Sequence, residues 1–173
     1  MTVDGLLTDA VVFEALYDDV VIPVRATEHS AGYDLHVYLK RREVSVRTAS
    51  GEEEVRYAGN EDDSGVVLSS GETGLFPLGF KARLPVGFEA QVRMRSSWAY
   101  AKGLWLPNAP GTIDADYPDE WMVMLRAGGQ GTVRITHGDR VAQAVLSRYE
   151  VVPWVPGTVG AVGDRTGGFG STG

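Results

Sequence analysis

The sequence predicts an all-β protein, a jelly-roll-like sandwich or barrel with one short helix and a flexible C-terminal arm. Three observations lead to this fold class. The 22 glycines and 8 prolines divide the 173-residue chain into apolar runs of strand length. These runs are rich in β-branched and aromatic residues, and Gly, Pro, Asp or Ser bounds them. Only one stretch has the composition of a helix, so we expect a single domain of short strands joined by turns.

The expected elements follow one another along the chain. The candidate strands read VVFEAL, VVIPV, YDLHVYL, GVVLSS, GLFPLGFKARL, FEAQVRM, EWMVMLRA, TVRITHG, VAQAVLSRY and VVPWV. The candidate helix reads SSWAYAKGL. Ser96 or Ser97 can cap its first turn, its alanines favour a helix, and Gly103 can end it.

Residues 40–65 resemble an insertion and are strongly charged. They contain the runs KRR, EEE and EDD, with the weakly alternating stretches EVSVR and EEVRY between them. We expect an exposed β-hairpin arm within a β domain of residues 1–162. Charge runs usually form a solvated surface, so this arm is assigned no chemistry. A protein partner for it stays open.

The chain ends on GDRTGGFGSTG, residues 163–173. Because glycine loses much conformational freedom on ordering, such a tail is costly to fix in place. One interpretation is a frayed terminus. The other is an arm that orders only over a ligand, with Arg165 and the hydroxyls of Ser171 and Thr172 for an anion and Phe169 for a flat group.

Composition excludes several classes of protein. The net charge of −7 argues against a general nucleic-acid binder, which normally has a basic surface. The absence of cysteine excludes disulfides, thiolate zinc sites and a cysteine nucleophile. No apolar stretch is long enough to cross a membrane, and the N-terminus has acids where a signal peptide has bases. We therefore expect a soluble, cytoplasmic protein.

A cluster of carboxylates surrounds a tyrosine in GTIDADYPDE, residues 111–120. A calcium loop starting at Asp114 fails on spacing, because Pro118, Asp119 and Leu125 occupy positions that need other residues. What remains is Asp114, a carboxylate just before a turn, which can orient and deprotonate a water. An Asp-rich turn without chemistry is the alternative.

An anion could bind where Arg95 precedes two serines at the start of the expected helix. Ordinary helix capping explains Ser96 equally well. Asp139 and Arg140 are expected to form an ion pair within a turn, and Gln143 needs hydrogen-bond partners if it is buried in its apolar strand.

Other common chemistries are missing from the sequence. It has no phosphate-binding P-loop, no G-x-S-x-G elbow and no H-E-x-x-H helix. The three histidines, His29, His36 and His137, lack any metal-ligand spacing. The residues therefore favour binding of a phosphorylated, ring-bearing small molecule and its hydrolysis by a carboxylate-activated water.

Five stretches, in this order, resemble the five motifs of the trimeric dUTP diphosphatases (dUTPases): AGYDLHV, RSSWAYAKG, NAPGTIDADY, GDRVAQ and GGFGSTG. The likeness spans about residues 21–173, apart from the charged arm. It implies a homotrimer of jelly-roll-like subunits with active sites at subunit interfaces. It also implies cleavage of dUTP to dUMP and pyrophosphate with Mg²⁺, which keeps uracil out of DNA and supplies dUMP for thymidylate synthesis.

The resemblance also implies roles for individual residues. Asp114 would activate the water that attacks the α-phosphorus. Mg²⁺ would sit on the triphosphate, with Asp34 holding a water on that ion. A β-hairpin from Asn108 to Met122 would read uracil, and Tyr117 would lie against the deoxyribose. The implied substrate contacts are Arg95, Ser96, Ser97, Asn108, Gly111, Thr112, Ile113, Tyr117, Met122, Gln143, Arg165, Phe169, Gly170, Ser171 and Thr172.

The implied motifs differ from the family pattern at three places. Ser97 replaces a glycine of the second motif. Pro118 and Asp119 replace Arg-Gly after Tyr117 in the third. Arg165 of the fifth motif lies one residue closer to the glycines than usual. A binding or signalling protein on the same scaffold and a dCTP deaminase are the alternatives, which turnover of dUTP or dCTP would distinguish.

Overall fold

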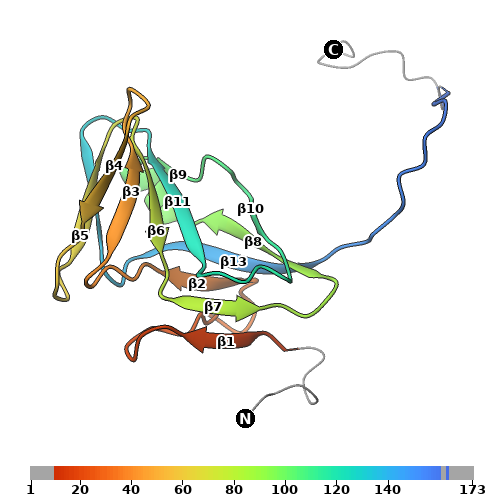
Figure 1. Ribbon diagram of the computed structural model, residues 1–173, viewed down its shortest axis with the longest axis horizontal. Helices are drawn as coiled ribbons and strands as arrows, with labels where there is room; N and C mark the ends of the chain where they lie inside the picture. Colours follow the sequence, from red (N-terminus) through yellow and green to blue (C-terminus); the bar gives the residue numbers. More distant parts are fainter. Residues whose placement is uncertain (1–9, 161–162, 164–173) are drawn as a thin grey trace.

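The structure, a computed structural model, describes residues 10–160 and residue 163. It confirms the predicted all-β class with one short helix (Figure 1). In chain order the elements are β1 Val12–Ala15, β2 Gly32–His36, β3 Glu43–Arg47, β4 Glu53–Tyr57, β5 Gly65–Ser69, β6 Thr73–Pro77, β7 Phe80–Arg83, β8 Phe88–Met94, α1 Ser96–Lys102, β9 Leu104–Trp105, β10 Gly111–Ile113, β11 Met122–Ala127, β12 Thr132–Thr136 and β13 Arg140–Arg148.

The strands form two larger antiparallel sheets and two strand pairs. The four-stranded sheet has the order β10-β8-β13-β2, and the five-stranded sheet has the order β4-β3-β6-β11-β9. The pairs are β1-β7 and β12-β5. In Figure 1 the strands of the five-stranded sheet run steeply across those of the four-stranded sheet.

The core is built from the inward-facing positions of both larger sheets. Leu35 and Ala142 come from the four-stranded sheet, and Val46, Phe76 and Leu125 come from the five-stranded one, all with 0% exposure. Buried and partly exposed residues alternate along β11, as expected for a strand with one face on the core. This packing fixes which residues of each strand point outward.

The outward face of the four-stranded sheet is polar, and it positions the candidate site. Gln143 on β13 pairs in register with Asp34 on β2 and with Arg93 on β8. Thr112 on β10 pairs with Gln91 on β8. Because paired residues of antiparallel strands point to the same side of a sheet, these side chains share one face.

The helix ends as predicted but begins differently. Gly103 adopts the left-handed conformation with φ 62° and closes α1. Arg95, not a serine, is the N-cap residue, and its side chain makes no capping hydrogen bond. The prediction that Ser96 or Ser97 caps the helix is therefore wrong. The Arg95 N–H donates to the Val141 carbonyl at 3.1 Å, so the chain is still held at the sheet when the helix begins.

The charged segment contains the expected hairpin, but only one of its strands is exposed. β3 and β4 pair with each other, and β3 also pairs with β6. Val44 and Val46 on β3 have 0% exposure, so β3 belongs to the core sheet and β4 forms its edge. The prediction of an exposed arm is therefore wrong for β3, whose alternate valines fit the pleat of a half-buried strand.

Two expected strands are absent from the described residues. VVIPV, residues 20–24, and VVPWV, residues 151–155, form no strand. Each contains a proline, which fixes φ and removes a backbone donor. The chain after β13 extends away from the sheets in Figure 1, and Trp154 there is 99% exposed.

Candidate functional site

Asp114 lies at the start of an exposed loop between the two larger sheets. It directly follows β10, which pairs with β8 through Gly111 and Ile113. The Tyr117 N–H donates to the Asp114 carbonyl at 3.2 Å, so a turn follows Asp114 as the sequence predicts. Within the described part of the chain, the Asp114 carboxylate accepts no hydrogen bond. Its oxygens are accessible to water.

The stretch from Asn108 to Met122 is not a paired hairpin. β10 belongs to the four-stranded sheet and β11 to the five-stranded sheet, so the loop crosses from one sheet to the other. This corrects the hairpin that the resemblance implies. The physical reason is that β11 has a partner on each side, β6 and β9, so β10 cannot pair with it and pairs with β8 alone.

Asn108 lies close to the beginning of β10. A Cβ atom at Gly111 would lie 3.2 Å from Asn108 Nδ2 and 3.4 Å from the Val92 Cβ. The missing side chain of Gly111 thus lets the amide of Asn108 approach the β10 backbone. The backbone groups of Thr112 and the amide of Asn108 are both near the loop that carries Asp114.

A second cluster lies at the other end of β8. Asp34 on β2 is 5% exposed, and its Oδ1 accepts a hydrogen bond from Arg95 Nη1. Its Oδ2 accepts one from Arg140 Nη1 at 3.2 Å. Two guanidinium groups share one carboxylate, so the cluster has an excess positive charge. With the Arg140 side chain 54% exposed, the cluster can bind an anion.

This cluster corrects one sequence prediction. Asp139 and Arg140 do not pair with each other: Asp139 Oδ2 accepts the Thr136 N–H at 2.8 Å, while Arg140 reaches Asp34. The Asp139 carboxylate bonds to the backbone of its own turn, and Arg140 instead pairs with Asp34 on the neighbouring strand β2.

His36 lies beside the same cluster. Burial lowers the pKa of His36, and the positive charges of Arg140 and Arg95 lower it further, although Asp34 acts in the opposite direction. The buried Nδ1 of His36 has no hydrogen-bond partner in the described chain. A neutral His36 adds no charge to the anion-binding cluster.

Gln143 occupies the middle of the polar face. Its side chain lies over Gly32 of β2, because a Cβ atom placed at Gly32 would come within 2.1 Å of Gln143 Oε1. Any larger residue at position 32 would therefore displace the Gln143 amide. The glycine of AGYDLHV thus makes room for the glutamine of GDRVAQ.

The Asp114 loop and the arginine cluster are far apart within one chain. Ile113, next to Asp114, faces Ala90 of β8. Arg95 follows Met94 at the opposite end of the same strand. Ala90 and Met94 are four positions apart on β8, which is roughly 13 Å at about 3.3 Å per residue. Asp114 and Arg95 lie beyond the two ends of that interval.

Comparisons with known proteins decide the family. The family model described as dUTPase matches residues 63–173. The deoxyuridine 5'-triphosphate nucleotidohydrolase of Rickettsia akari (strain Hartford) is 39% identical over 153 residues, covering 88% of this chain and 88% of that protein. The chain belongs to the dUTPase family.

Solved dUTPase structures are similar to this chain over most of its length. The dUTPase from Streptococcus mutans is 26% identical, with a TM-score of 0.62, covering 82% of this chain and 98% of that one. The Staphylococcus bacteriophage 80alpha dUTPase, solved with dUPNHPP, has a TM-score of 0.71 at 19% identity, covering 95% of this chain and 98% of that one. The second likeness shows the fold alone.

The other implied dUTPase site residues fall into two groups. Ser96 and Ser97 are exposed in the first turn of α1, and Met122 begins β11, where it pairs with Pro77. Tyr117 is 39% exposed. The implied contacts in the arm, Arg165, Phe169, Gly170, Ser171 and Thr172, lie outside the described residues.

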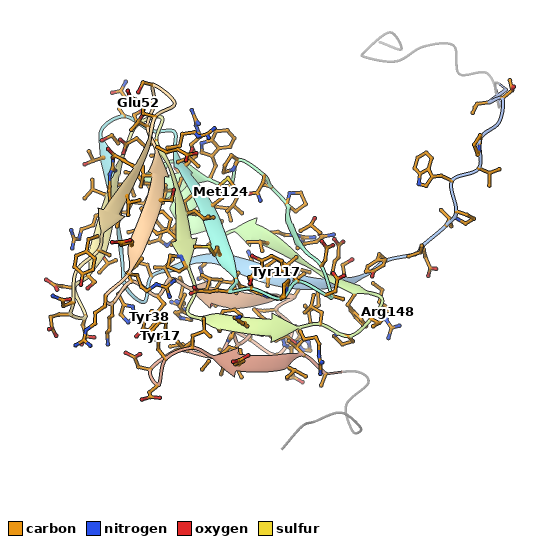
Figure 2. The ribbon with its side chains drawn as sticks, viewed as in Figure 1. Tyr17, Tyr38, Glu52, Tyr117, Met124 and Arg148 are labelled. Carbon is orange, nitrogen blue, oxygen red and sulfur yellow. The ribbon has the colours of Figure 1, made fainter. Side chains whose placement is uncertain are left out.

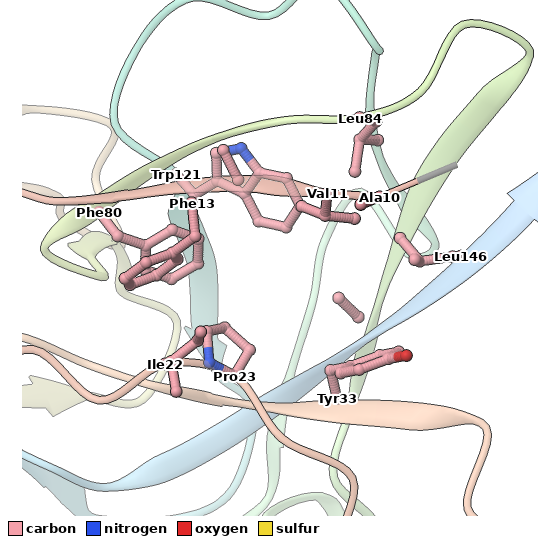
Figure 3. A pocket seen from close by; sticks show the side chains of 12 residues that line it. Ala10, Val11, Phe13, Ile22, Pro23, Tyr33, Phe80, Leu84, Trp121 and Leu146 are labelled. Atoms are coloured by element: carbon pink, nitrogen blue, oxygen red, sulfur yellow. The ribbon is translucent and has the colours of Figure 1, made fainter. Parts of the chain in front are cut away.

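An apolar cavity of about 370 Å³ lies apart from these dUTPase residues (Figure 3). Phe13 of β1, Tyr33 of β2 and Trp121 are among its lining residues, and none of the implied substrate contacts is. Its lining is largely hydrocarbon and offers little for a triphosphate. The candidate site lies on an exposed loop and a sheet face, so this cavity is not part of it.

The sequence alone missed the roles of Arg140 and Glu120. Arg140 completes the arginine cluster, and Glu120 holds the end of the Asp114 loop. The signal for Arg140 was its place three residues before Gln143 on a strand that pairs with β2. No local signal indicated Glu120, because its partners come from distant turns.

No helix in the described part is long and apolar enough to cross a membrane.

Proposed function

We propose that this chain hydrolyses dUTP to dUMP and pyrophosphate, with Asp114 as the general base. Membership of the dUTPase family carries the reaction, since 39% identity extends over 88% of the chain. The exposed carboxylate of Asp114 at the start of the loop supports the role of this residue. It is accessible to water and held in place by β10 on one side and the turn to Tyr117 on the other.

The reaction follows from these groups. Asp114 accepts a proton from a water as the water oxygen forms a bond to the α-phosphorus. The bond from the α-phosphorus to the bridging oxygen of the β-phosphate breaks, and pyrophosphate leaves with that oxygen. The attacking water becomes part of dUMP, and the proton on Asp114 passes to solvent. Arg95, Arg140 and Gln143 orient the phosphates.

Mg²⁺ fits this site as an ion carried by the substrate. In the described part of the chain, no group of three His, Cys, Asp or Glu residues could hold a metal ion. Mg²⁺ bound to nucleotides commonly uses one or two carboxylates with waters and phosphate oxygens. Asp34 fits a contact through water, because its two oxygens already accept arginine donors. Mg²⁺ would offset negative charge on the triphosphate.

Sharing of the site between subunits is part of the proposal. The resemblance to the trimeric dUTPases implies a homotrimer. The separation of the Asp114 loop from the Arg95 cluster along β8 fits an arrangement in which the loop of one subunit faces the arginine cluster of another. The arm of residues 163–173 would close over that site, excluding water while the nucleotide is bound. The base would be read by backbone groups near Thr112 and by Asn108.

Asp114→Asn tests the proposal, with Asp116→Asn as the matched control in the same loop. We expect Asp114→Asn to bind dUTP normally and to lose turnover by roughly 10²–10⁴-fold, as when a general base is removed. Asp116 is exposed and has no partner side chain in the described chain, so Asp116→Asn should keep its turnover. Equal rates in both variants would exclude Asp114 as the base.

A further inference from the structure

We propose that Arg42 is a positioning residue for the loop that carries Asp114 and Tyr117, and that it acts through Glu120. This inference rests on the proposed function, which assigns that loop to dUTP. It gives a role to the charged segment of residues 40–65.

The loop has little structure of its own. Residues 114–119 form no strand, and all of them except Ala115 are exposed. Its internal hydrogen bonds run from the Tyr117 N–H to the Asp114 carbonyl at 3.2 Å and from the Tyr117 hydroxyl to the Glu120 carbonyl at 3.5 Å. The places of Asp114 and Tyr117 therefore depend on how the two ends of the loop are held.

Glu120 fixes the second end with both carboxylate oxygens. Its Oε2 accepts from Arg42 Nη2 at 2.6 Å, and its Oε1 accepts from Arg42 Nη1 at 3.1 Å and from the Gly79 N–H at 2.8 Å. The Arg42 and Glu120 side chains are only 18% and 17% exposed. A two-pronged pair of this kind constrains direction as well as distance.

The Gly79 donor is available only because residue 79 is glycine. Gly79 has a φ of 77°, and a Cβ atom there would lie 2.9 Å from the Tyr38 Cβ and from the Val20 Cγ2. The turn between β6 and β7 can thus present its N–H to Glu120 without a side chain in the way.

Arg42 is held in turn by Tyr17 and by the backbone of Ala58. Its Nη1 donates to the Tyr17 hydroxyl at 2.9 Å, and its carbonyl accepts the Ala58 N–H at 2.9 Å. Tyr17 stacks on Tyr38 with ring centroids 4.4 Å apart, and the two rings lie together in Figure 2. Burial acts against the charge of Arg42, but its bonds and attraction to Glu120 outweigh this and raise the pKa of Arg42.

The same hairpin provides a matched control. Arg47 pairs with Glu53 at 2.7 Å, but these side chains are 63% and 67% exposed and make no contact with the loop. Removing Arg47 takes the same charge from the same hairpin. A loss of activity that occurs on removal of Arg42 but not of Arg47 must then come from the hydrogen bonds of Arg42 to Glu120.

The test compares Arg42→Met, Arg42→Lys and Glu120→Gln with Arg47→Met in the full chain. We expect Arg42→Met and Glu120→Gln to lower kcat/KM for dUTP by about 10–100-fold, because small misplacements of reacting groups are costly. The ratio of kcat/KM for dUTP to kcat/KM for dTTP should fall at the same time. Arg42→Lys keeps the positive charge but cannot bond both oxygens of Glu120 as a guanidinium does, so its kcat/KM should lie between those of the wild type and Arg42→Met. Arg47→Met should have the kcat/KM of the wild type.

Amide hydrogen exchange at Tyr117, whose N–H donates to the Asp114 carbonyl within the loop, separates this inference from the proposed function. We expect faster exchange in Arg42→Met than in the wild type and in Arg47→Met. A lower Tm with unchanged exchange and unchanged dUTP preference would make Arg42 merely structural and overturn the inference. A wild-type chain without dUTP turnover would instead refute the proposed function, and the exchange rates would still decide whether Arg42 positions the loop.

Discussion

Asp34 and Arg140 meet across β2 and β13 although 106 positions separate them in the chain. Arg140 Nη1 lies 3.2 Å from one carboxylate oxygen, and Arg95 takes the other. Asp34 therefore orients two arginines at once, on the face of the sheet where the phosphates of dUTP are proposed to bind.

We predict that Asp34→Asn lowers kcat/KM for dUTP by about 10–100-fold. Charge-assisted hydrogen bonds contribute roughly 1.5–3 kcal/mol each, and part of this is lost to solvent because Arg140 is half exposed. Steady-state kinetics would measure the change. Asp139→Asn is the control, since an amide oxygen can still accept the Thr136 N–H. If both variants kept wild-type kinetics, Asp34 would have no part in holding the phosphate-binding arginines.

We predict that deletion of residues 163–173 leaves the β domain folded and suppresses turnover. The proposed role of this arm is to close the site over the nucleotide, which the sheets do not need for stability. Thermal unfolding and pyrophosphate release on the truncated chain would measure both. Normal hydrolysis by the truncated protein would contradict closure by the arm.

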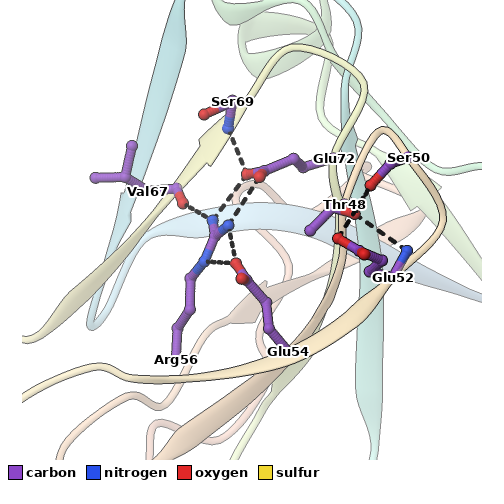
Figure 4. A network of polar contacts seen from close by, with 8 residues as sticks. All are labelled: Thr48, Ser50, Glu52, Glu54, Arg56, Val67, Ser69 and Glu72. Carbon is purple, nitrogen blue, oxygen red and sulfur yellow. Dashed lines mark hydrogen bonds and ion pairs between the residues drawn. The ribbon is translucent and has the colours of Figure 1, made fainter.

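We predict that Glu72→Gln destabilises the fold by about 1.5–3 kcal/mol without changing turnover per folded molecule. Glu72 is 8% exposed and accepts two bonds from Arg56 and one from the Ser69 N–H (Figure 4). It thereby ties edge strand β4 to the turn between β5 and β6. Urea unfolding would measure the loss.

Glu54→Gln is the control for this ion pair. Glu54 also bonds Arg56, but its side chain is 45% exposed, so its loss should cost less than about 1 kcal/mol. An equal loss in the free energy of unfolding for the two variants would show that burial of Glu72 does not strengthen its ion pair with Arg56.

We predict that the free energy of unfolding falls as the pH drops below about 6.5. Burial lowers the pKa values of His36 and His137 from their usual 6.5. The unfolded chain then binds more protons than the folded chain, so stability is complete above the unfolded pKa and is lost as pH falls through the folded pKa. Urea unfolding at pH 7.5 and 5.5 would measure it. A stability that stays constant over this interval would contradict burial of these imidazoles in their neutral form.

Much of the fold could be predicted from local sequence, whereas the partners of individual side chains could not. Strand-length runs between turn formers gave the all-β class, and Gly103 marked the end of the helix. The β-branched residues of VVIPV and VVPWV predict strands, but each stretch contains a proline that lacks a backbone donor, and neither forms a strand. Val44 and Val46 alternate as core residues, but the charges around them pointed to an exposed arm.

The site shows the same division. The residues around Asp114, Arg95 and Gln143 could be found from motifs and from the chemistry of their side chains. Arg140 pairs with Asp34, and not with Asp139, because β2 lies next to β13. The ion pair of Arg42 with Glu120 joins the segment before β3 to the end of the Asp114 loop, and the turn at Gly79 adds a further donor. Such contacts are set by tertiary packing, which local patterns do not encode.

The measurement that tests the central claim most directly is pyrophosphate release by the full chain with Mg²⁺, comparing dUTP, dTTP, dCTP and UTP side by side. Proposed contacts to the base edge and to the deoxyribose predict release from dUTP and little from the other three, because a mismatched base leaves buried polar groups unpaired. Release from dCTP in place of dUTP, or from none of the four, would contradict the assignment of this chain as a dUTP hydrolase.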